Sequence, residues 1–320
     1  MADKAARIVR AGAGTRPVMI AIAGDSAAGK TTLTRGLVAA LGPERCVSIC
    51  VDDYHRFDRV ERRGLPFTAL HPDCNHLDIM EQHLQLLAGG QPILKPVYDH
   101  ATGALTRPEL VEARRFVIVE GLFPMHSKLA RACFDVTVYL DPSEDTRRGW
   151  KLARDTTERG YSPAQVLAEL DRRAADSAAY VRPQRSHADV VVRFAPVAVR
   201  DDPPDTPLSA ELVLRPTIRH PDLRDVLGRD GIRRDVAVAG RERTMHLRLG
   251  RDTDGRPVDT LHVHGYVPVE ESRSLQQAIW ALLDQPGEVP AGLGSIGTGQ
   301  RSEPLAVTQL LLLFHLFDAA

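Results

Sequence analysis

The chain is poor in cysteine, with four residues in 320, and none of them follows Cys133. These cysteines form no CxxC pair, which excludes both the disulfide framework of a small secreted domain and the paired thiolates of a structural zinc site. So few unpaired thiols are typical of proteins from a reducing compartment. We therefore expect a cytoplasmic protein.

Further features that the sequence lacks argue against two classes of partner, nucleic acids and membranes. Lys and Arg number 41 against 42 for Asp and Glu, so the chain lacks the basic excess that is typical of nucleic-acid binding. Its longest apolar run, residues 310–317, is far shorter than the roughly 20 residues of a membrane-spanning helix. The N-terminus has no apolar segment of signal-peptide length. We expect neither a nucleic-acid nor a membrane partner.

The first part of the sequence alternates apolar runs with helical patterns. The runs are continuous, as in strands buried on both faces of a parallel sheet, and they cover residues 18–24, 46–51, 115–121, 134–141 and 188–194. Helical patterns lie at residues 30–41, 77–88, 143–160 and 163–180. This order predicts an α/β core, a parallel sheet flanked by helices, over residues 17–196. A polar, flexible leader is expected at residues 1–16.

The pattern changes after a Pro- and Asp-rich segment at residues 195–207, which is typical of a linker or surface crossing. Polar and apolar residues then alternate, as in half-exposed antiparallel strands, at residues 208–216, 243–250 and 260–267. Helical patterns follow at residues 271–285 and 303–318. We predict a C-terminal α+β extension of antiparallel strands over residues 205–320, whose strand edge offers a surface for a homodimer.

The most specific motif is Gly24-Asp25-Ser26-Ala27-Ala28-Gly29-Lys30-Thr31, which satisfies the P-loop pattern GxxxxGK[ST] between a predicted strand and a predicted helix. The glycines let successive backbone N–H groups converge on phosphate oxygens at the positive end of the helix dipole. Lys30 is expected to reach the β- and γ-phosphates of ATP, and the Thr31 hydroxyl to ligate Mg²⁺. We expect the motif and Thr32 to bind the nucleotide in a P-loop kinase-like sheet.

Carboxylates follow two further predicted strands. Asp52 and Asp53 come after the strand that follows the P-loop helix, and Glu120 ends the strand at residues 115–121. Ligands bind at the carboxyl edge of an open α/β sheet, so an acid there can accept the proton of an attacking hydroxyl or hold Mg²⁺. We expect Glu120 to hold the metal with Thr31. The alternative for the acid pair is a solvated turn.

Basic residues follow the acid pair. His55, Arg56 and Arg59 fit recognition of a phosphate on the acceptor, because arginine binds phosphate in a bidentate manner. The alternative is an exposed basic loop paired with Asp58 and Glu61. The absence of an NKxD motif argues against a GTPase and leaves the small-molecule kinases, which need such an acceptor site.

A second basic segment covers residues 150–161. Lys151, Arg154 and Asp155 share one face of a predicted helix, and Arg159 lies just past it. Cations on a mobile helix pair can close over the nucleotide and offset the charge on the transferred phosphoryl group. The alternative is an ordinary helix surface covered by salt bridges.

The P-loop occurs in order with DDYHRFDR at residues 52–59, KPVYDH at 95–100, VIVEGL at 117–122 and WKLARDTTERGY at 150–161. Together these motifs resemble the phosphoribulokinase family, and HPDCNHLDIM at 71–80 and GSIGTGQ at 294–300 resemble its oxygenic-type branch. The resemblance implies transfer of a phosphoryl group from ATP, with Mg²⁺, to the 1-hydroxyl of D-ribulose 5-phosphate. The product would be D-ribulose 1,5-bisphosphate of the Calvin cycle, formed by direct in-line transfer.

The resemblance also implies roles for single residues, with Asp52 as the general base and Asp155 as a second acid. The catalytic set that it implies is Asp52, Lys30, Lys151, Arg154 and Asp155. The sugar-phosphate set is His55, Arg59, Tyr98, His100, Lys151 and Arg154. The resemblance also implies that Arg159 binds the nucleotide, together with the P-loop residues and Thr32. Tyr98 and His100 are expected on the resemblance alone, since a lone Tyr or His is more often a core or rim residue.

The sequence departs from the family pattern at two places. Plant-type members carry a P-loop cysteine that pairs with one just before the DDYH segment; here Cys50 holds the second position, but Ala28 stands in the first. The usual C-terminal cysteine pair is also missing, since no cysteine follows Cys133. We therefore predict that thioredoxin does not switch this protein. Phe123 stands where the family commonly has histidine.

Two other functions fit part of the sequence. A uridine kinase or related nucleoside kinase would share the P-loop, the acid after the second strand and the lid arginines. It would not account for Arg59, for Lys151 or for the C-terminal extension. A non-catalytic nucleotide-binding regulator would use that extension for partners, but the intact P-loop and the acids argue against it.

Overall fold

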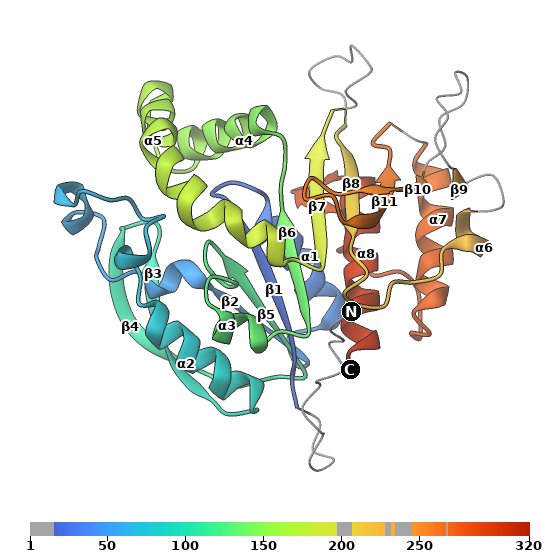
Figure 1. The fold of residues 1–320 in the computed structure, drawn as a ribbon, viewed down its shortest axis with the longest axis horizontal. Helices are drawn as coiled ribbons and strands as arrows, with labels where there is room; N and C mark the ends of the chain where they lie inside the picture. The colour runs from blue at the N-terminus through green and yellow to red at the C-terminus, as the bar shows by residue number, and fades with distance from the viewer. Residues whose placement is uncertain (1–15, 197–206, 228–231, 234–244, 267) are drawn as a thin grey trace.

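The computed structural model of the chain describes residues 16–196, 207–227, 232–233, 245–266 and 268–320 (Figure 1). The leader expected at residues 1–16 lies outside the described residues except for Arg16. Most of the linker expected at residues 195–207 lies outside them as well. The fold therefore concerns the predicted core and most of the C-terminal extension.

Nine strands of the described residues form one sheet (Figure 1). In spatial order they are β2 (Cys46–Cys50), β5 (Phe116–Gly121), β1 (Val18–Gly24), β6 (Val136–Leu140), β7 (Val190–Ala195), β8 (Ser209–Leu214), β11 (Pro257–Val263), β10 (Met245–Arg251) and β9 (Ile232–Arg233). The first five strands in this order, β2, β5, β1, β6 and β7, are parallel to one another. β8 pairs antiparallel with β7, so the C-terminal strands extend the core sheet instead of forming a second one. The predicted fold class is confirmed.

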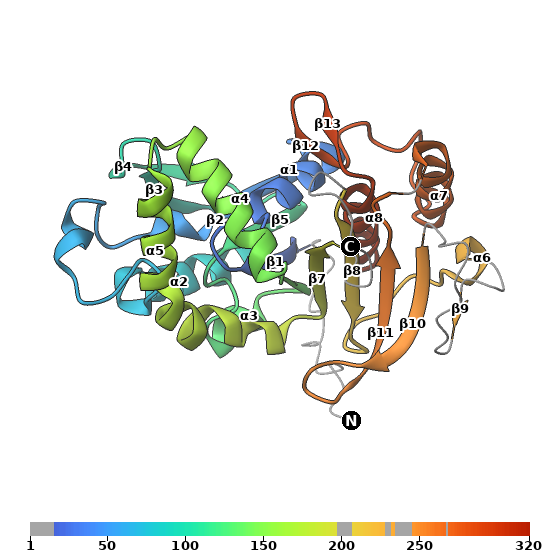
Figure 2. The ribbon, with the colours of Figure 1, turned by 90° about the horizontal axis from the view of Figure 1, so that it is seen from above.

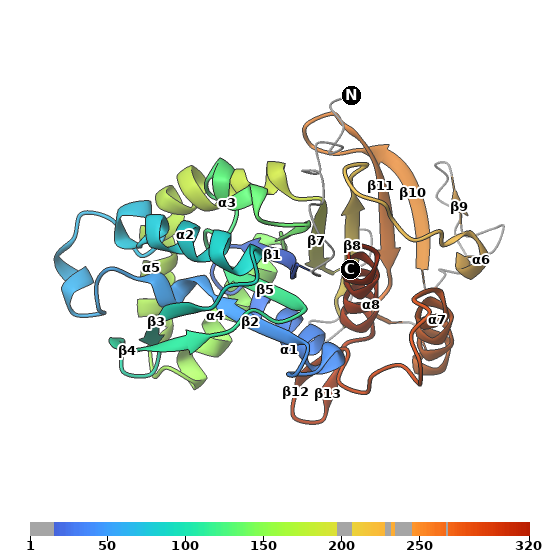
Figure 3. The ribbon, with the colours of Figure 1, turned by 90° about the horizontal axis from the view of Figure 1, so that it is seen from below.

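Helices cover both faces of this sheet. α1 (Lys30–Leu41), α7 (Val269–Leu282) and α8 (Glu303–Asp318) lie on one face, and α2 (Leu77–Ala88) and α3 (Lys128–Ala132) on the other (Figures 2 and 3). Because both faces are covered, successive residues of β1 alternate between two apolar cores. α4 (Glu144–Thr157) and α5 (Pro163–Asp176) lie beyond the carboxyl edge of the parallel strands (Figure 1), and α6 (Arg224–Leu227) is a short turn beside β10.

The apolar run near the C-terminus belongs to α8, whose residues 304–313 are all buried against α1, α7 and β8. Gln309 joins α8 to α1: its Nε2 donates to the Leu33 carbonyl over 3.0 Å, and its Oε1 accepts from the Gly294 N–H over 2.7 Å. A side chain at position 36 would displace Gln309 from these hydrogen bonds, because a Cβ there would lie 2.0 Å from Gln309 Nε2. Among the helices of the described residues, none is both long enough and apolar enough for a membrane crossing.

Three short elements differ from the sequence prediction. β3 (Ile93–Asp99) pairs in a hairpin with β4 (Ala104–Val111), which the sequence does not predict because residues 105–110 are exposed in succession and show no alternation. The helix expected over residues 163–180 is α-helical only to Asp176; a π-helical turn (Ser177–Val181) and a 3₁₀ turn (Arg182–His187) follow. The glycine-rich loop before α8 holds a small hairpin of β12 (Ser295–Gly297) and β13 (Gln300–Arg301).

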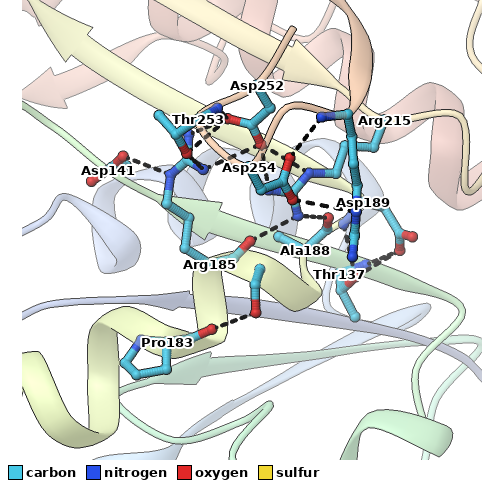
Figure 4. A network of polar contacts seen from close by, with 12 residues as sticks. Thr137, Asp141, Pro183, Arg185, Ala188, Asp189, Arg215, Asp252, Thr253 and Asp254 are labelled. Carbon is cyan, nitrogen blue, oxygen red and sulfur yellow. Dashed lines mark hydrogen bonds and ion pairs between the residues drawn. The ribbon is translucent and has the colours of Figure 1, made fainter.

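A buried ionic cluster joins the β10–β11 hairpin to the core (Figure 4). The Asp252 side chain, in the turn of this hairpin, is 2% exposed and accepts from Arg215, at the end of β8, and from Arg185, in the 3₁₀ turn. Arg185 Nε also lies 3.0 Å from Asp141 Oδ2, past the end of β6. Although burial acts against it, the hydrogen bonds from both arginines hold the pKa of Asp252 well below its usual range. The cluster therefore fixes the extension to the core by charge as well as by strand pairing.

Replacing Asp252 by Asn should destabilise the protein by about 3 kcal/mol, because the change leaves two buried guanidinium groups without their shared carboxylate. Urea unfolding followed by circular dichroism measures this loss. The difference from the wild type should shrink as the pH falls below the usual titration range of aspartate, since stability that comes from a depressed carboxyl pKa is lost on protonation.

Asp222→Asn is the matched control for this experiment. Asp222 pairs with Arg224, and both side chains are exposed, so the loss of this pair should leave stability nearly unchanged. If both variants were equally stable, the ionic cluster would not hold the hairpin in place.

Candidate active site

The P-loop turns sharply from β1 into α1, in the strand–loop–helix context that the motif requires. Gly24 lies against Leu140 of β6, and a Cβ there would come 2.7 Å from the Leu140 carbonyl oxygen. Ala27 and Gly29 adopt positive φ angles of 62° and 92°. Backbone of this kind turns successive N–H groups toward one concavity, which suits phosphate oxygens.

Lys30 and Thr31 are the first residues of α1. Lys30 Nζ donates to the carbonyls of Gly24 and Asp25 over 3.0 and 2.9 Å, so it folds back over the loop. Thr31 Oγ1 donates to Glu120 Oε1 over 2.9 Å. Burial raises the pKa of Glu120, and the charge of Lys30 offsets part of that shift. A hydroxyl and a carboxylate at this spacing are hard oxygen donors, so the two residues fit the expected Mg²⁺.

The Asp25 side chain supports the P-loop from outside. Its Oδ1 accepts from the Ser26 N–H over 2.7 Å, and its Oδ2 accepts from the Ser177 hydroxyl of the π-helical turn. Arg147 of α4 lies 3.8 Å from the same carboxylate and donates to the Ser26 carbonyl over 3.2 Å. Contact of Asp25 with a nucleotide would therefore come from its backbone.

The adjacent acids Asp52 and Asp53 lie in a 3₁₀ turn (Val51–Tyr54) directly after β2, and their surroundings differ. Asp53 accepts from the Tyr98 N–H over 2.9 Å and forms an ion pair with Lys95, whose side chain is only 5% exposed. Asp53 thus anchors the β3–β4 hairpin. Asp52 is left as the acid that a ligand can reach, a division that the residue pattern does not show and that only the family resemblance implies.

Asp52 is surrounded by cations and imidazoles. Its Oδ2 lies 4.0 Å from His100 Nε2. Burial acts to raise the pKa of Asp52, but His55, Lys30, His100 and Arg173, with the two imidazoles protonated in the acid range where Asp52 titrates, together hold it below its usual range. The carboxylate is therefore ionised at neutral pH and can accept a proton.

His55 and Tyr98 form a buried pair beside Asp52. The His55 residue is 4% exposed, and its ring meets that of Tyr98 edge-on at 4.8 Å. Burial lowers the pKa of His55 to about 4, so the ring is neutral. Asn75 donates from its Nδ2 to backbone carbonyls, which leaves its Oδ1 to accept from His55 Nδ1 over 2.7 Å. The other ring nitrogen is then an acceptor, and a bond from it to phosphate would need a protonated ring.

Two arginines reach the β3–β4 hairpin from the segment after the acids. Arg59 donates to the His100 carbonyl from its side chain and to the Gly103 carbonyl from its backbone. Arg62 lies 5.0 Å from the centre of the Tyr98 ring and donates to the Tyr98 hydroxyl. Arg62 Nη1 is buried and has no hydrogen-bond partner within the described part of the chain. The sequence does not single out Arg62, because it belongs to no motif.

Asp155 holds the predicted cations of α4 at one carboxylate. Lys151 Nζ lies 2.7 Å from its Oδ2, Arg154 Nε donates to its Oδ1 over 2.9 Å, and Arg159 Nη1 lies 3.5 Å away. Burial lowers the pKa of Lys151 to about 8; Arg173 adds to this effect and Asp155 opposes it. Lys151 and Asp155 are buried, unlike the exposed salt bridges of an ordinary helix surface.

A hollow between the P-loop and the α4–α5 pair has a basic lining. Its cations are Arg147, Arg148, Lys151, Arg173 and Arg182, and its acids are Asp25 and Glu144. The sequence predicts only Lys151 among these cations, because the others are spread along two helices and the turn that follows. An excess of positive charge beside the P-loop suits a polyphosphate.

Phe123 and Cys50 are the residues at the two departures from the family pattern, and their surroundings in the structure differ. Phe123 is fully buried in the core that α2 covers, with its ring 5.6 Å from that of His126, so this difference concerns packing. Cys50 ends β2 beside Glu120 of β5 and is partly exposed. It is a free thiol, as are the other three cysteines.

Comparison with known proteins agrees with these motifs. Residues 19–199 match the Phosphoribulokinase / Uridine kinase family. A phosphoribulokinase of Synechocystis sp. is 40% identical over 204 residues, which are 64% of this chain and 61% of that one. A uridine kinase of Chloroflexus aurantiacus is 31% identical over 182 residues, 55% of this chain and 87% of that one. The solved phosphoribulokinase from Rhodobacter spheroides shares the fold, with a TM-score of 0.52 and 19% identity over 66% of this chain and 82% of that one.

The chain thus spans less than two thirds of the length of the Synechocystis phosphoribulokinase. The family match covers more than half of this chain and includes the P-loop, the acids and α4. The resemblance seen in the motifs is confirmed at the level of the family. The chain therefore belongs to the phosphoribulokinase/uridine kinase family.

Proposed function

We propose that the protein transfers the γ-phosphoryl group of ATP to the 1-hydroxyl of D-ribulose 5-phosphate, forming ribulose 1,5-bisphosphate for the Calvin cycle. The main support for the proposal is the position of Asp52. It is an ionised carboxylate at the sheet edge, 4.0 Å from His100, and the positive charge of Lys30 in the P-loop helps to lower its pKa. Such a group can take the proton of a hydroxyl that attacks a bound γ-phosphate. The 40% identity with a phosphoribulokinase supports this choice of reaction.

The proposed transfer is in line. The hydroxyl oxygen attacks the γ-phosphorus while Asp52 takes its proton, and the bond from the γ-phosphorus to the bridging oxygen breaks, so that ADP leaves. Lys30 and the cations of α4 offset the negative charge on the equatorial oxygens, and Arg159 contacts the nucleotide. Thr31 and Glu120 would hold Mg²⁺, which neutralises phosphate charge when bound.

We place the phosphate of the acceptor beside the β3–β4 hairpin. Arg59 and Arg62 donate hydrogen bonds to this hairpin. The N–H groups of Arg62 Nη1 have no partner within the described residues, so they can donate to a phosphate. Tyr98 and His100 line the same region. His55 contributes by packing against Tyr98, since its buried neutral ring is poorly suited to a direct phosphate bond.

A nucleoside kinase is the second candidate, because a uridine kinase aligns over 87% of its own length. A nucleoside carries no phosphate, so it would leave Arg59 and Arg62 without a counter-charge. A coupled assay of ADP formation separates the two candidates: turnover of ribulose 5-phosphate but not of uridine is expected, and turnover of uridine alone would overturn the proposal. Binding of ATP without transfer to either acceptor would favour the non-catalytic regulator.

Several expectations from the sequence remain predictions. We propose a cytoplasmic homodimer that pairs through the C-terminal strand edge. We also propose the division of the chain into a leader at residues 1–16, a core at 17–196 and an extension at 205–320. The pairing of β7 with β8 joins the core to the extension.

Asp52→Asn should lower kcat by at least about a hundredfold, because the amide cannot accept the hydroxyl proton. Asp53→Asn is the matched control: it removes the ion pair with Lys95 and should lower the Tm, with a smaller effect on kcat. Steady-state kinetics and thermal unfolding of both variants test the assignment. A near-normal kcat in Asp52→Asn would remove Asp52 from the role of general base.

The kcat should decline above about pH 8, because Lys151 has a pKa of about 8 and loses its positive charge as the pH rises through that value. Lys151→Arg keeps the charge, since arginine stays protonated, and should move the decline to higher pH. Measurements of kcat with saturating substrates from about pH 6 to 10 test both statements. The same decline in wild type and variant would assign it to another group.

Oxidation should not switch the activity reversibly. Ala28 occupies the position of the P-loop cysteine, and burial together with Asp52 and Glu120 raises the pKa of Cys50, which keeps its reactive thiolate scarce. Activity is compared after treatment with a mild oxidant and again after a dithiol. A loss on oxidation that the dithiol restores would contradict the prediction.

A further inference from the structure

We propose that Cys50, Asp52 and His100 form a metal site for Zn²⁺, and that Zn²⁺ bound there blocks phosphoryl transfer. Cys50 ends β2, Asp52 lies in the 3₁₀ turn that follows, and His100 comes just after β3. One ligand atom from each of these side chains lies within 4.8 Å of the other two. The set offers one sulfur, one oxygen and one nitrogen, a combination that suits Zn²⁺.

The spacing is close to that of a tetrahedral zinc site. Zinc–ligand bonds of about 2.0–2.3 Å at the tetrahedral angle place neighbouring ligand atoms about 3.3–3.8 Å apart. Asp52 Oδ2 and His100 Nε2 are 4.0 Å apart and all three ligand atoms lie within 4.8 Å of one another, so the side chains would have to move closer by roughly 1 Å to reach this spacing. The His100 side chain is 44% exposed, which leaves it room to rotate and opens the site to solvent. The fourth coordination position is free for water.

The charges around Cys50 favour a cation. Burial first, and then the negative charges of Asp52, Glu120 and Asp53, raise the pKa of the Cys50 thiol. A metal ion that replaces the thiol proton relieves the repulsion from the three carboxylates, although not the effect of burial, and binding releases that proton to solvent. Burial lowers the pKa of His100, so its imidazole is neutral at pH 7 and has a lone pair to give. The nearby positive charge of Lys30 repels any cation. The negative charges around Cys50 act against this repulsion.

The proposed site is distinct from the Mg²⁺ position. Thr31 and Glu120 offer hard oxygen donors, whereas Cys50 offers a thiolate, which Mg²⁺ does not take. The two positions lie at the same sheet edge, since Cys50 and Glu120 are partners in the β2–β5 register. An excess of Mg²⁺ should therefore not displace Zn²⁺ from Cys50.

Blocking follows from the shared use of Asp52. When Asp52 Oδ2 is a metal ligand, it cannot take the proton of the acceptor hydroxyl. This effect on turnover rests on the proposed function. The binding of the metal ion does not, because it requires only the three side chains.

Metal binding is tested first, with Co²⁺ as a spectroscopic probe and without ATP or sugar phosphate. The reduced full-length protein should show the near-ultraviolet absorption of a thiolate-to-cobalt charge transfer, and Zn²⁺ should remove it, since Zn²⁺ binds such sites more tightly. Cys50→Ser should lose the absorption. Cys133→Ser is the matched control, because the Cys133 thiol contacts the Leu129 carbonyl at 3.5 Å and does not belong to the cluster of Cys50, Asp52 and His100. Absence of the absorption in the wild type, or its persistence in Cys50→Ser, would overturn the proposal.

Turnover of ribulose 5-phosphate is then measured against Zn²⁺ concentration in excess Mg²⁺ and ATP. Cys50→Ser should keep the basal kcat, and the Zn²⁺ concentration that halves its rate should rise at least about tenfold. Equal inhibition of wild type and Cys50→Ser would overturn the blocking role. A cobalt absorption that depends on Cys50, in a protein that does not turn over ribulose 5-phosphate, would support the metal site and reject the proposed function.

Discussion

The site depends on one constraint: parallel strands all end at the same edge of their sheet. β1 and β5 are buried on both faces, so the polar groups of the site gather at or just past the carboxyl ends of the strands: Glu120 is the last residue but one of β5, and Asp52 follows the edge strand β2. Lys30, Asp52 and Glu120 come together for this reason, although the chain separates them widely. α4 and α5 lie beyond the same edge, which brings their cations to the P-loop (Figure 1).

The sequence predicts what depends on neighbouring residues, such as the P-loop context and the buried strands. Its residue pattern does not separate Asp52 from Asp53, and only the family resemblance points to Asp52, because the difference between the two acids comes from Lys95, which is 42 residues away from Asp53. Arg62 and Arg173 are missed for the same reason, since each acquires its place only when distant segments pack together. β4 is missed because its exposed residues give no apolar period, so tertiary pairing with β3 decides its structure.

Ion pairs, more than apolar packing, hold the charged side chains of the site in position. Asp53 with Lys95 and Asp155 with Lys151 are buried or nearly buried pairs, and each fixes a cation or an acid before any ligand arrives. The neighbours of Asp52 lower its pKa, as those of Asp155 do, so in the proposed reaction Asp52 would be a weak base. A weak base suits a phosphoryl transfer with a loose transition state, in which the hydroxyl proton leaves late.

The contact of Gln309 with Leu33 joins residues that are 276 positions apart. A ribosome releases α1 long before α8, so the side of the P-loop helix that contacts α8 stays uncovered for most of synthesis, while its other side can already pack on β1, β2 and β5. Closing a loop of such length has an entropic cost that slows folding. The contact of α1 with α8 is therefore the last step that synthesis allows for the support of the nucleotide cradle. A nucleotide that binds only the finished cradle would add its binding free energy to that last step.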